Sequence, residues 1–541
     1  MDEFTEAEAK LLRPYVTNLD KSIFVLTNLP EVVKGALFSR YSRTTKSLRR
    51  VLLDEFMLSS ELGVNEIFGG SSDHSTKQST IQTKKAEEFY DRVLVGYGDD
   101  SVAELAGAHI AIEDVSILAT KTLQDARLGL SPLEKSTRYV YFDNKDEEGN
   151  WRYYKDKEVM GSSFAEIYTQ SCDFAFETYA KLIPKVSKFI SEKEPRPEGV
   201  SDRAYASTLR AKTCDILRGL LPAATLTNMG FFGDGRAYEY LITKLYSSEL
   251  EEFRSVGKTM QEELSQVIPS FVKRANDKHG QAMQEYWKAN LRAVDKFACP
   301  INEHSGEAGV FLVDAENEIT SIDKVVKYIL FAQMNVSIET IKEKIGKMTK
   351  EEKIGIIDAY VGERQNRRQK PSRAFEHINY TFEIVANYGA YRDLHRHRVL
   401  TQQRQLLTPY LGHKMPKEII EAGFEKEFKE VMEKSKETFD QMYPKFANQA
   451  QYVVPLAYNI RWYMNLNLRE AYHLIELRSA MQGHIDYREV VQKMFGEIEK
   501  IHPQLSKGMK FVDMKTYALE RLEAEKRIDK KLEEIGVKYG K

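Results

Sequence analysis

The sequence has three cysteines among 541 residues, Cys172, Cys214 and Cys299, and no two of them form a CxxC pair. Cysteines spaced this widely argue against a zinc cluster and against a disulfide framework. No stretch approaches the roughly 18 consecutive apolar residues that a membrane-spanning helix needs. The first ten residues, MDEFTEAEAK, also lack the apolar centre of a signal peptide. We therefore expect a cytoplasmic protein with reduced thiols and no membrane partner.

An excess of either charge is also missing. The chain has 79 lysines and arginines against 81 aspartates and glutamates, so the total charge gives no reason to expect nucleic acid as a partner. A content of 30% charged and 42% hydrophobic residues is typical of folded globular proteins. A chain of this length is expected to form roughly two to four domains.

The most unusual stretch that is present is LHRHRVLTQQRQLL, residues 394–407. It follows an alternating segment, 378–384, that predicts a half-buried strand, and a segment, 388–399, that predicts a helix. Four consecutive histidines and arginines on a helix cannot all face solvent, which favours an anionic ligand nearby. The alternative is a solvated helix end, where the helix dipole favours cations. His395 and His397 would point apart on a helix, so we expect no metal site from them.

The order of the other segments predicts mostly helices with few strands. We expect helices in 1–60, 84–98, 117–128, 155–290 with a break at 192–202, 324–337, 415–450 and 515–541, strands at 106–112 and, with a turn, in 309–319, and polar loops at 131–138 and 399–408.

The chain contains an internal duplication. Glu104 and Glu376 each precede a strand with the same alternation, and each strand is followed by a helix and a polar loop. Later, each half has an apolar segment with a proline, LLPAATL and VVPLAYN, and an arginine 14 positions after that proline. The same order and the same spacing in both halves predict two divergent copies of one domain.

The two copies differ in their polar residues. The first has Glu134, Ser136 and Arg138 in the pattern ExSxR, and Arg218 four residues before its proline. The second has the Arg-His-Arg run and Arg478, for which the first copy has no counterpart. Each copy therefore holds groups that the other lacks.

These residue types suit an anionic ligand. Arginine forks match phosphate oxygens, so Arg138 and Arg218 with the Ser136 hydroxyl form a candidate phosphate clamp. Ser136 and Arg138 would project together from an extended loop, with Glu134 on the same side. The alternative for each arginine is an ordinary surface salt bridge. Arg478, at the end of a mostly apolar helix, is a candidate for stabilising negative charge on a substrate ring.

The Arg-His-Arg run, the ExSxR loop and the later Asn-x-Arg and Leu-Arg helix resemble the flavin-dependent thymidylate synthases. The resemblance covers two copies, roughly 30–255 and 308–490. It implies an α+β fold in which two thymidylate synthase complementing-protein-like domains, each an antiparallel sheet with long helices, form a pseudo-dimer. The loop-like segment CPINEHSGEAG near residue 300 predicts the boundary between domains at 1–300 and 301–500, and the alternating charges after them predict a charged helical tail at 501–541.

The resemblance implies one composite site with walls from both copies. The reaction implied is reductive methylation of dUMP at C5, with FAD as cofactor and with methylenetetrahydrofolate and NADPH as co-substrates. The family's assembly implies a homodimer that acts as a pseudo-tetramer. The residues expected to contact substrate are Glu134, Ser136, Arg138, Arg218 and Arg396, with Arg478 as the catalytic group. Those expected to contact FAD are Ser101, Arg396, His397, Arg398, Asn467, Arg469 and His473.

Three positions depart from the family's pattern. Asp393 stands where the family has a glutamine that contacts the nucleotide, Leu133 stands where it has an asparagine, and His473 replaces another asparagine. An aspartate near an anionic ligand would repel it, which predicts weaker dUMP binding or another substrate. The alternatives are therefore a flavoenzyme that modifies another pyrimidine nucleotide, and a decayed protein that binds nucleotide or flavin without catalysis.

Overall fold

The structure is a computed structural model that describes residues 3–58, 100–125, 127–298 and 307–539. The expected helix at 84–98 and Cys299 lie outside these residues. The chain forms two compact units: the first comprises 1–115, 122–135 and 227–299, and the second comprises 116–121, 136–226 and 300–541. No helix within the described ranges has the length and apolar character needed to cross a bilayer.

The first unit contains an antiparallel sheet in the order β1-β3-β2. Its strands are β1 (Gly107–Ser116), β2 (Leu130–Glu134) and β3 (Leu226–Asp234). Ala108 and Ile112 of β1 are buried, Ile110 between them is half-buried, and His109 and Ala111 are exposed, which agrees with the alternation expected for this strand. Helices of this unit are α1 (Glu6–Leu12), α2 (Glu31–Tyr41), α3 (Leu48–Val51), α10 (Gly235–Tyr246), α11 (Glu251–Leu264), α12 (Pro269–Val272) and α13 (Lys278–Asp295).

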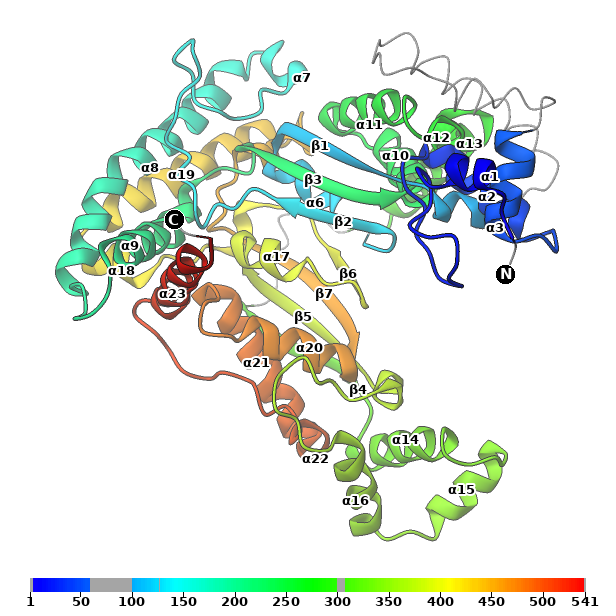
Figure 1. Ribbon diagram of the computed structural model, residues 1–541. Coiled ribbons are helices and arrows are strands. Elements are labelled where there is room, and N and C mark those ends of the chain that lie inside the picture. Colours follow the sequence, from blue (N-terminus) through cyan, green and yellow to red (C-terminus); the bar gives the residue numbers. More distant parts are fainter. Residues whose placement is uncertain (1–2, 59–99, 126, 299–306, 540–541) are drawn as a thin grey trace. The chain divides into compact units, whose positions relative to one another are not determined.

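The second unit contains a four-stranded antiparallel sheet in the order β4-β5-β7-β6 (Figure 1). Its strands are β4 (Gly309–Ala315), β5 (Asn379–Asn387), β6 (Leu400–Arg404) and β7 (Asn459–Asn467). Tyr380, Phe382 and Ile384 of β5 are fully buried, as their spacing predicted. Helices α20 (Leu468–Arg478) and α21 (Ile485–Ile501) lie beside this sheet (Figure 1).

The remaining helices of the second unit include a long pair, α8 (Ala165–Lys193) and α9 (Asp202–Leu217), which pack together. The break between them confirms the interruption expected at 192–202. The others are α6 (Ile117–Leu123, mostly in this unit), α7 (Lys157–Met160), α14 (Glu318–Phe331), α15 (Ile338–Gly346), α16 (Lys350–Val361), α17 (Tyr388–Leu394), α18 (Lys417–Glu421), α19 (Glu425–Met442), α22 (Pro503–Ser506) and α23 (Leu522–Tyr539).

The duplication is visible in the strand order. The three strands β1-β3-β2 and the three strands β5-β7-β6 have the same connectivity and the same neighbours. The two proline segments also pair with each other: Pro222 and Pro455 form an antiparallel bridge, and the Ala223 N–H donates to the Val454 carbonyl at 2.9 Å. Equivalent segments that meet in this antiparallel way are what a pseudo-twofold axis produces. The α+β fold with two copies is confirmed.

Several strands were not anticipated. The expected polar loops at 131–138 and 399–408 begin as strands β2 and β6, and β3 and β7 lie in regions expected to be helical or left unassigned. Each of these strands pairs with a partner distant in sequence, as in Leu130 with Gly233 and Leu400 with Leu466. The backbone hydrogen bonds of these strands are made with distant segments, so they leave no local signal in the sequence. A short strand also has too few residues to show a clear alternation.

The boundaries of the compact units differ from the predicted domain boundary near residue 300. The second unit takes 136–226 from the first copy, so it contains segments from both copies. The predicted boundary describes the repeated sequence, and the units describe which segments pack together.

Candidate functional site

The Arg-His-Arg run follows a helix end and does not lie within the helix. Helix α17 stops at Leu394, with His395 as its C-cap, so the helix expected to continue to residue 399 is shorter. The following residues lead into strand β6, whose pairing with β7 requires an extended backbone. His395 and His397 are buried all the same, which makes a fully solvated helix end wrong.

His397 connects α20 to the run through two hydrogen bonds. The Arg478 Nε–H donates to His397 Nε2 at 3.0 Å, and His397 Nδ1 lies 2.8 Å from Glu470 Oε1. Because Nε2 accepts a hydrogen bond, the proton of a neutral imidazole is on Nδ1 and is donated to Glu470. Burial raises the pKa of Glu470 to about 7, although nearby Lys370 and Arg469 oppose this rise. The Nε end of the Arg478 guanidinium is thus held by the buried His397, which is itself held by the buried carboxyl of Glu470.

Cationic residues lie near His397 and Glu470. The ring of His473 lies 5.5 Å from that of His397, and burial with nearby Lys370 and Arg367 lowers the pKa of His473 to about 4. His397, Glu470 and His473 have ligand atoms within 4.8 Å of one another, which is a metal-like spacing. The surrounding lysine and arginines repel a cation, so the electrostatics favour an anion here.

Arg138 is held by partners from both copies. Its Nε and Nη2 donate to the two carboxylate oxygens of Asp215 at 2.7 and 2.6 Å. Its Nη1 donates to the Tyr487 hydroxyl at 3.2 Å, and Nη2 also lies 3.4 Å from the Gln482 carbonyl. Burial would raise the pKa of Asp215, but Arg138 and His484 outweigh it and hold that pKa well below its usual value.

Arg218 shows the same pairing. It lies in the short 3₁₀ turn after α9 and is 3% exposed, and its Nη1 donates to Asp393 Oδ2 at 3.1 Å. The Arg218 Nη2 is buried and has no hydrogen-bond partner among the described residues. An added side chain at Gly389 would come within 3.3 Å of this Nη2, so the guanidinium lies directly against α17.

Asp393 is the point at which the two copies meet. Burial alone would raise the pKa of its carboxyl, but four guanidinium groups outweigh burial and hold the pKa well below its usual value. In order of decreasing effect, they belong to Arg218, Arg396, Arg138 and Arg478. Two of these arginines come from the first copy and two from the second, so the structure brings the predicted walls together within one unit.

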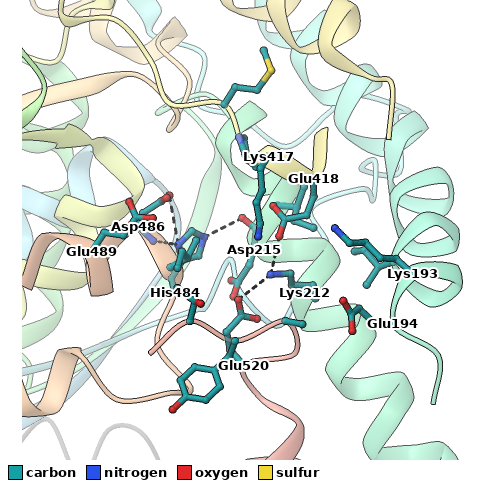
Figure 2. A pocket seen from close by; sticks show the side chains of 18 of the residues that line it. Lys193, Glu194, Lys212, Asp215, Lys417, Glu418, His484, Asp486, Glu489 and Glu520 are labelled. Carbon is teal, nitrogen blue, oxygen red and sulfur yellow. Dashed lines mark hydrogen bonds and ion pairs between the residues drawn. The ribbon is translucent and has the colours of Figure 1, made fainter. Parts of the chain in front are cut away.

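A cavity of about 310 Å³ is lined in part by Asp215, the partner of Arg138 (Figure 2). Its wall includes Asp215 and His484, and its Lys212 contacts Glu418 and Glu520 at 3.0 and 2.9 Å. His484 Nε2 lies 3.0 Å from the Asp215 carbonyl, and its Nδ1 accepts from the Asp486 N–H at 3.1 Å. The neutral ring therefore ties α21 to the helix that carries Asp215.

Because the His484 ring is buried and neutral, we predict that the protein loses stability in mild acid. Burial and nearby Arg218 lower the pKa of His484 from 6.5 to about 4, so the folded state binds fewer protons than the unfolded state between these values. Stability therefore falls as the pH drops through this window, by on the order of 3 kcal/mol. We expect the melting temperature of His484→Gln to vary less between pH 7 and 4 than that of the wild type. The exposed His279→Gln serves as control, and an unchanged slope in His484→Gln would contradict the assignment.

The other predicted residues have mixed surroundings. The Ser136 hydroxyl accepts from the Arg138 backbone N–H at 3.2 Å, so the expected extended loop is a turn closed by this serine. Glu134 ends β2 in the first unit, where its carboxylate accepts from Gln124 at 2.9 Å. Ser101 lies in the 3₁₀ helix Asp100–Leu105, and its side chain is outside the described part.

The predicted flavin residues of α20 are partly engaged by the fold. The Asn467 side-chain oxygen caps the helix by accepting from the Glu470 N–H at 2.8 Å. This cap does not use the NH₂ group of the Asn467 side chain. The Arg469 Nε donates to the Pro371 carbonyl at 2.9 Å. Arg398 is exposed and Arg396 is half-buried.

Several residues at this site were not singled out in the sequence. Asp215 and Tyr487 hold Arg138, and no local pattern marks either of them. Arg367 and Lys370 come from the run RQNRRQK, whose density of positive charge was a usable signal. Among the described residues, neither of these two cations has a carboxylate within salt-bridge distance, whereas the neighbouring Arg364, Arg373 and Arg469 each do.

Comparison with known proteins agrees with this arrangement. The model of the thymidylate synthase complementing protein family matches residues 60–270 and 321–504. A UPF0159 protein of Chlamydia pneumoniae is 44% identical over 97% of this chain and 98% of its own length, and one of Thermoplasma acidophilum is 33% identical over 91% and 98%. A flavin-dependent thymidylate synthase of Saccharolobus solfataricus is 31% identical over 24% of this chain and 54% of its own. The two matched segments and the repeated strand order show that the chain belongs to the thymidylate synthase complementing protein family, in a form with two copies of the domain.

Proposed function

We propose that this protein is a flavin-dependent enzyme that reductively methylates C5 of a uracil nucleotide. The reference reaction is that of dUMP with methylenetetrahydrofolate, with the hydride of NADPH supplied through FAD. The relatives named flavin-dependent thymidylate synthase support this class of activity.

The surroundings of the Arg478 guanidinium are the observation that carries the proposal. Its Nε contacts a neutral histidine nitrogen, its guanidinium lies 5.8 Å from the centre of the Tyr487 ring, and no described carboxylate lies within salt-bridge distance of it. Burial lowers the pKa of Arg478, which means that the charged form lacks part of its hydration. A guanidinium in such surroundings is stabilised by an anionic ligand.

A deprotonated pyrimidine ring is such a ligand. A cation beside the ring stabilises the N3-deprotonated form of uracil, which raises the electron density at C5 and makes that carbon nucleophilic. The buried cysteines do not suit the alternative of attack by a thiolate, because burial raises the pKa of Cys214 to about 12 and that of Cys172 well above its usual value. The proposed role of Arg478 is thus to hold the ring anion.

The cationic residues around His473 fit the diphosphate of FAD. Arg367 and Lys370 have no carboxylate partner within the described ranges, and burial with nearby Arg469 and Arg367 lowers the pKa of Lys370. An unpaired cationic group of this kind is suited to phosphate oxygens. Bound flavin would supply hydride transfer. The residues proposed to hold it are Arg396, His397, Arg398, Asn467, Arg469 and His473, to which we add Arg367 and Lys370 because both lie near His473.

Two alternatives remain, and the first has an observation in its favour. Asp393 lies among arginines proposed for the substrate, which favours a pyrimidine ligand other than dUMP. A protein that binds flavin or nucleotide without catalysis is the other alternative.

Flavin binding and turnover separate these possibilities. We expect purified protein incubated with FAD to show flavin absorbance in the visible range, and addition of a uracil substrate to perturb that spectrum. With methylenetetrahydrofolate present, NADPH oxidation should then depend on the uracil substrate and yield its 5-methyl product, detected by chromatography. Absence of bound flavin after incubation contradicts the proposal, whereas flavin binding without substrate-dependent oxidation favours the non-catalytic alternative.

A further inference from the structure

The C-terminal segment of the chain contacts the turn at 136–139 and the helix behind it, all within the second unit. This segment lies after the end of the second match to the family model, so it lies outside the repeated domain. It is held on two helices: Arg488 of α21 donates to the Lys515 carbonyl at 2.8 Å, and Arg203 of α9 donates to the Glu525 carbonyl at 3.0 Å. Since α21 belongs to the second copy and α9 to the first, the segment spans both copies.

Glu520 of this segment is fixed to the helix that carries Asp215. The Lys212 ammonium donates to Glu520 Oε1 at 2.9 Å, and both side chains are nearly buried (Figure 2). Asp215 follows Lys212 by about one turn of α9, and it accepts two hydrogen bonds from Arg138. The segment is thus anchored beside the aspartate that holds Arg138.

The next residue, Arg521, covers the ring of Tyr139. Its guanidinium carbon lies 3.9 Å from the ring centre, which is a close cation–π contact. Arg521 is 6% exposed, its Nε has no hydrogen-bond partner, and no carboxylate of the described residues lies within salt-bridge distance of it. A buried guanidinium without a counter-ion is unfavourable for folding, so a role in stability does not explain Arg521.

Tyr139 belongs to the turn that places Arg138. The Ser136 hydroxyl accepts from the Arg138 N–H at 3.2 Å and the Ser136 carbonyl accepts from the Tyr139 N–H at 3.4 Å, so these residues form one compact turn. The Tyr139 side chain is 53% exposed, so little protein other than Arg521 restrains it. Holding Tyr139 holds the backbone next to Arg138, whose Nη1 donates to the Tyr487 hydroxyl of the second copy.

We propose that Arg521 is a positioning residue of the composite site: its contact with Tyr139 holds the turn at 136–139 and thereby keeps Arg138 in place for the uracil substrate. This inference rests on the proposed function and adds the C-terminal segment to the site. Arg521 acts through Tyr139 and Arg138 and does not touch the ligand.

Hydrogen exchange of the FAD-loaded protein tests the contact itself. In Arg521→Ala we expect the Arg138 and Tyr139 amides, both hydrogen-bonded within the turn, to exchange at least about fivefold faster than in the wild type. The peptide that contains them is followed by mass spectrometry. Exchange in β7 should stay at the wild-type rate, whereas a variant that is merely less stable would exchange faster in both places.

Substrate affinity tests the role in the site. The FAD-loaded protein is titrated calorimetrically, well below its melting temperature, with dUMP and with 2′-deoxyuridine. Arg521→Ala should bind the ligand that the wild type prefers at least about fivefold more weakly. Its flavin spectrum before ligand is added should match that of the wild type.

Two further variants show whether the effect passes through Tyr139. Tyr139→Leu removes the other partner of the contact and should weaken binding by a similar factor. The double variant of Arg521→Ala and Tyr139→Leu should bind no more weakly than either single variant, because both remove one contact. Arg527→Ala removes an exposed arginine from α23 and should bind as the wild type does.

The outcomes are distinguishable. If the wild type binds a pyrimidine and Arg521→Ala binds it equally tightly, the inference is overturned and the proposed function stands. Unchanged exchange in the turn, or additive losses in the double variant, also overturns the inference alone. If flavin binds but neither pyrimidine binds the wild type, both the inference and the proposed function fail. Weaker binding with faster exchange in the turn but not in β7, and with no added loss in the double variant, supports both.

Discussion

Replacing Arg478 with alanine is expected to lower kcat by about 100- to 1,000-fold, as is usual when a group that stabilises charge in the transition state is removed. Arg478 lies near Asp393, contacts a neutral histidine and has no carboxylate within salt-bridge distance in the described structure. Its removal takes away the charge proposed to stabilise the ring anion. The rate is measured as substrate-dependent NADPH oxidation with a uracil nucleoside or nucleotide.

Flavin binding and an exposed control separate catalysis from folding in that experiment. Arg478→Ala should retain its flavin spectrum, because the cations near His473 stay in place. Arg527→Ala, which removes an arginine from the exposed face of α23, should keep the wild-type rate. If Arg478→Ala keeps both its flavin and more than about a tenth of the wild-type rate, Arg478 does not hold the ring anion.

The second large effect concerns stability. Asp215→Ala should lower the free energy of unfolding by about 3–5 kcal/mol, because it leaves the nearly buried Arg138 without its bidentate partner. The measurement is the melting temperature together with urea denaturation at pH 7. A change below about 1 kcal/mol would show that solvent or another group replaces Asp215 easily.

A double variant tests whether the charge, and not the volume, causes that loss. Arg138→Met combined with Asp215→Leu removes both charges and keeps apolar volume, so it should be more stable than Asp215→Ala alone. It should nevertheless have little activity, because the Tyr487 hydroxyl and the Gln482 carbonyl lose their contact with the guanidinium. Equal instability of the single and double variants would contradict the role of the ion pair.

Much of the fold could be predicted from the repeated pattern in the sequence. The alternation at 378–384 and the repeated proline-to-arginine spacing depend on residues close together in the chain, and local periodicity is enough to detect them. Strands β2, β3, β6 and β7 were missed because their stability comes from pairing across long sequence separations, which no local pattern records.

For the site, the sequence singled out candidate arginines but did not indicate which groups hold them. Arg138 and Arg218 were expected at a phosphate, and the structure places an aspartate on each. Asp393 was noticeable as an anion near a proposed anionic ligand, whereas Asp215 is an ordinary residue of α9 with no distinguishing neighbours in the sequence. A counter-ion is chosen by three-dimensional proximity, so only the fold could reveal it.

The central claim is that one chain supplies both walls of the site, as the contact between Arg138 and Tyr487 indicates. Mixing Arg138→Gln and Arg478→Gln, each first shown to be folded and to bind flavin, tests it most directly. If both walls come from one chain, every site in the mixture carries one defect and the mixture should be as inactive as either variant alone. Recovery of about a quarter or more of the wild-type rate would show that the walls meet between chains and would contradict the account.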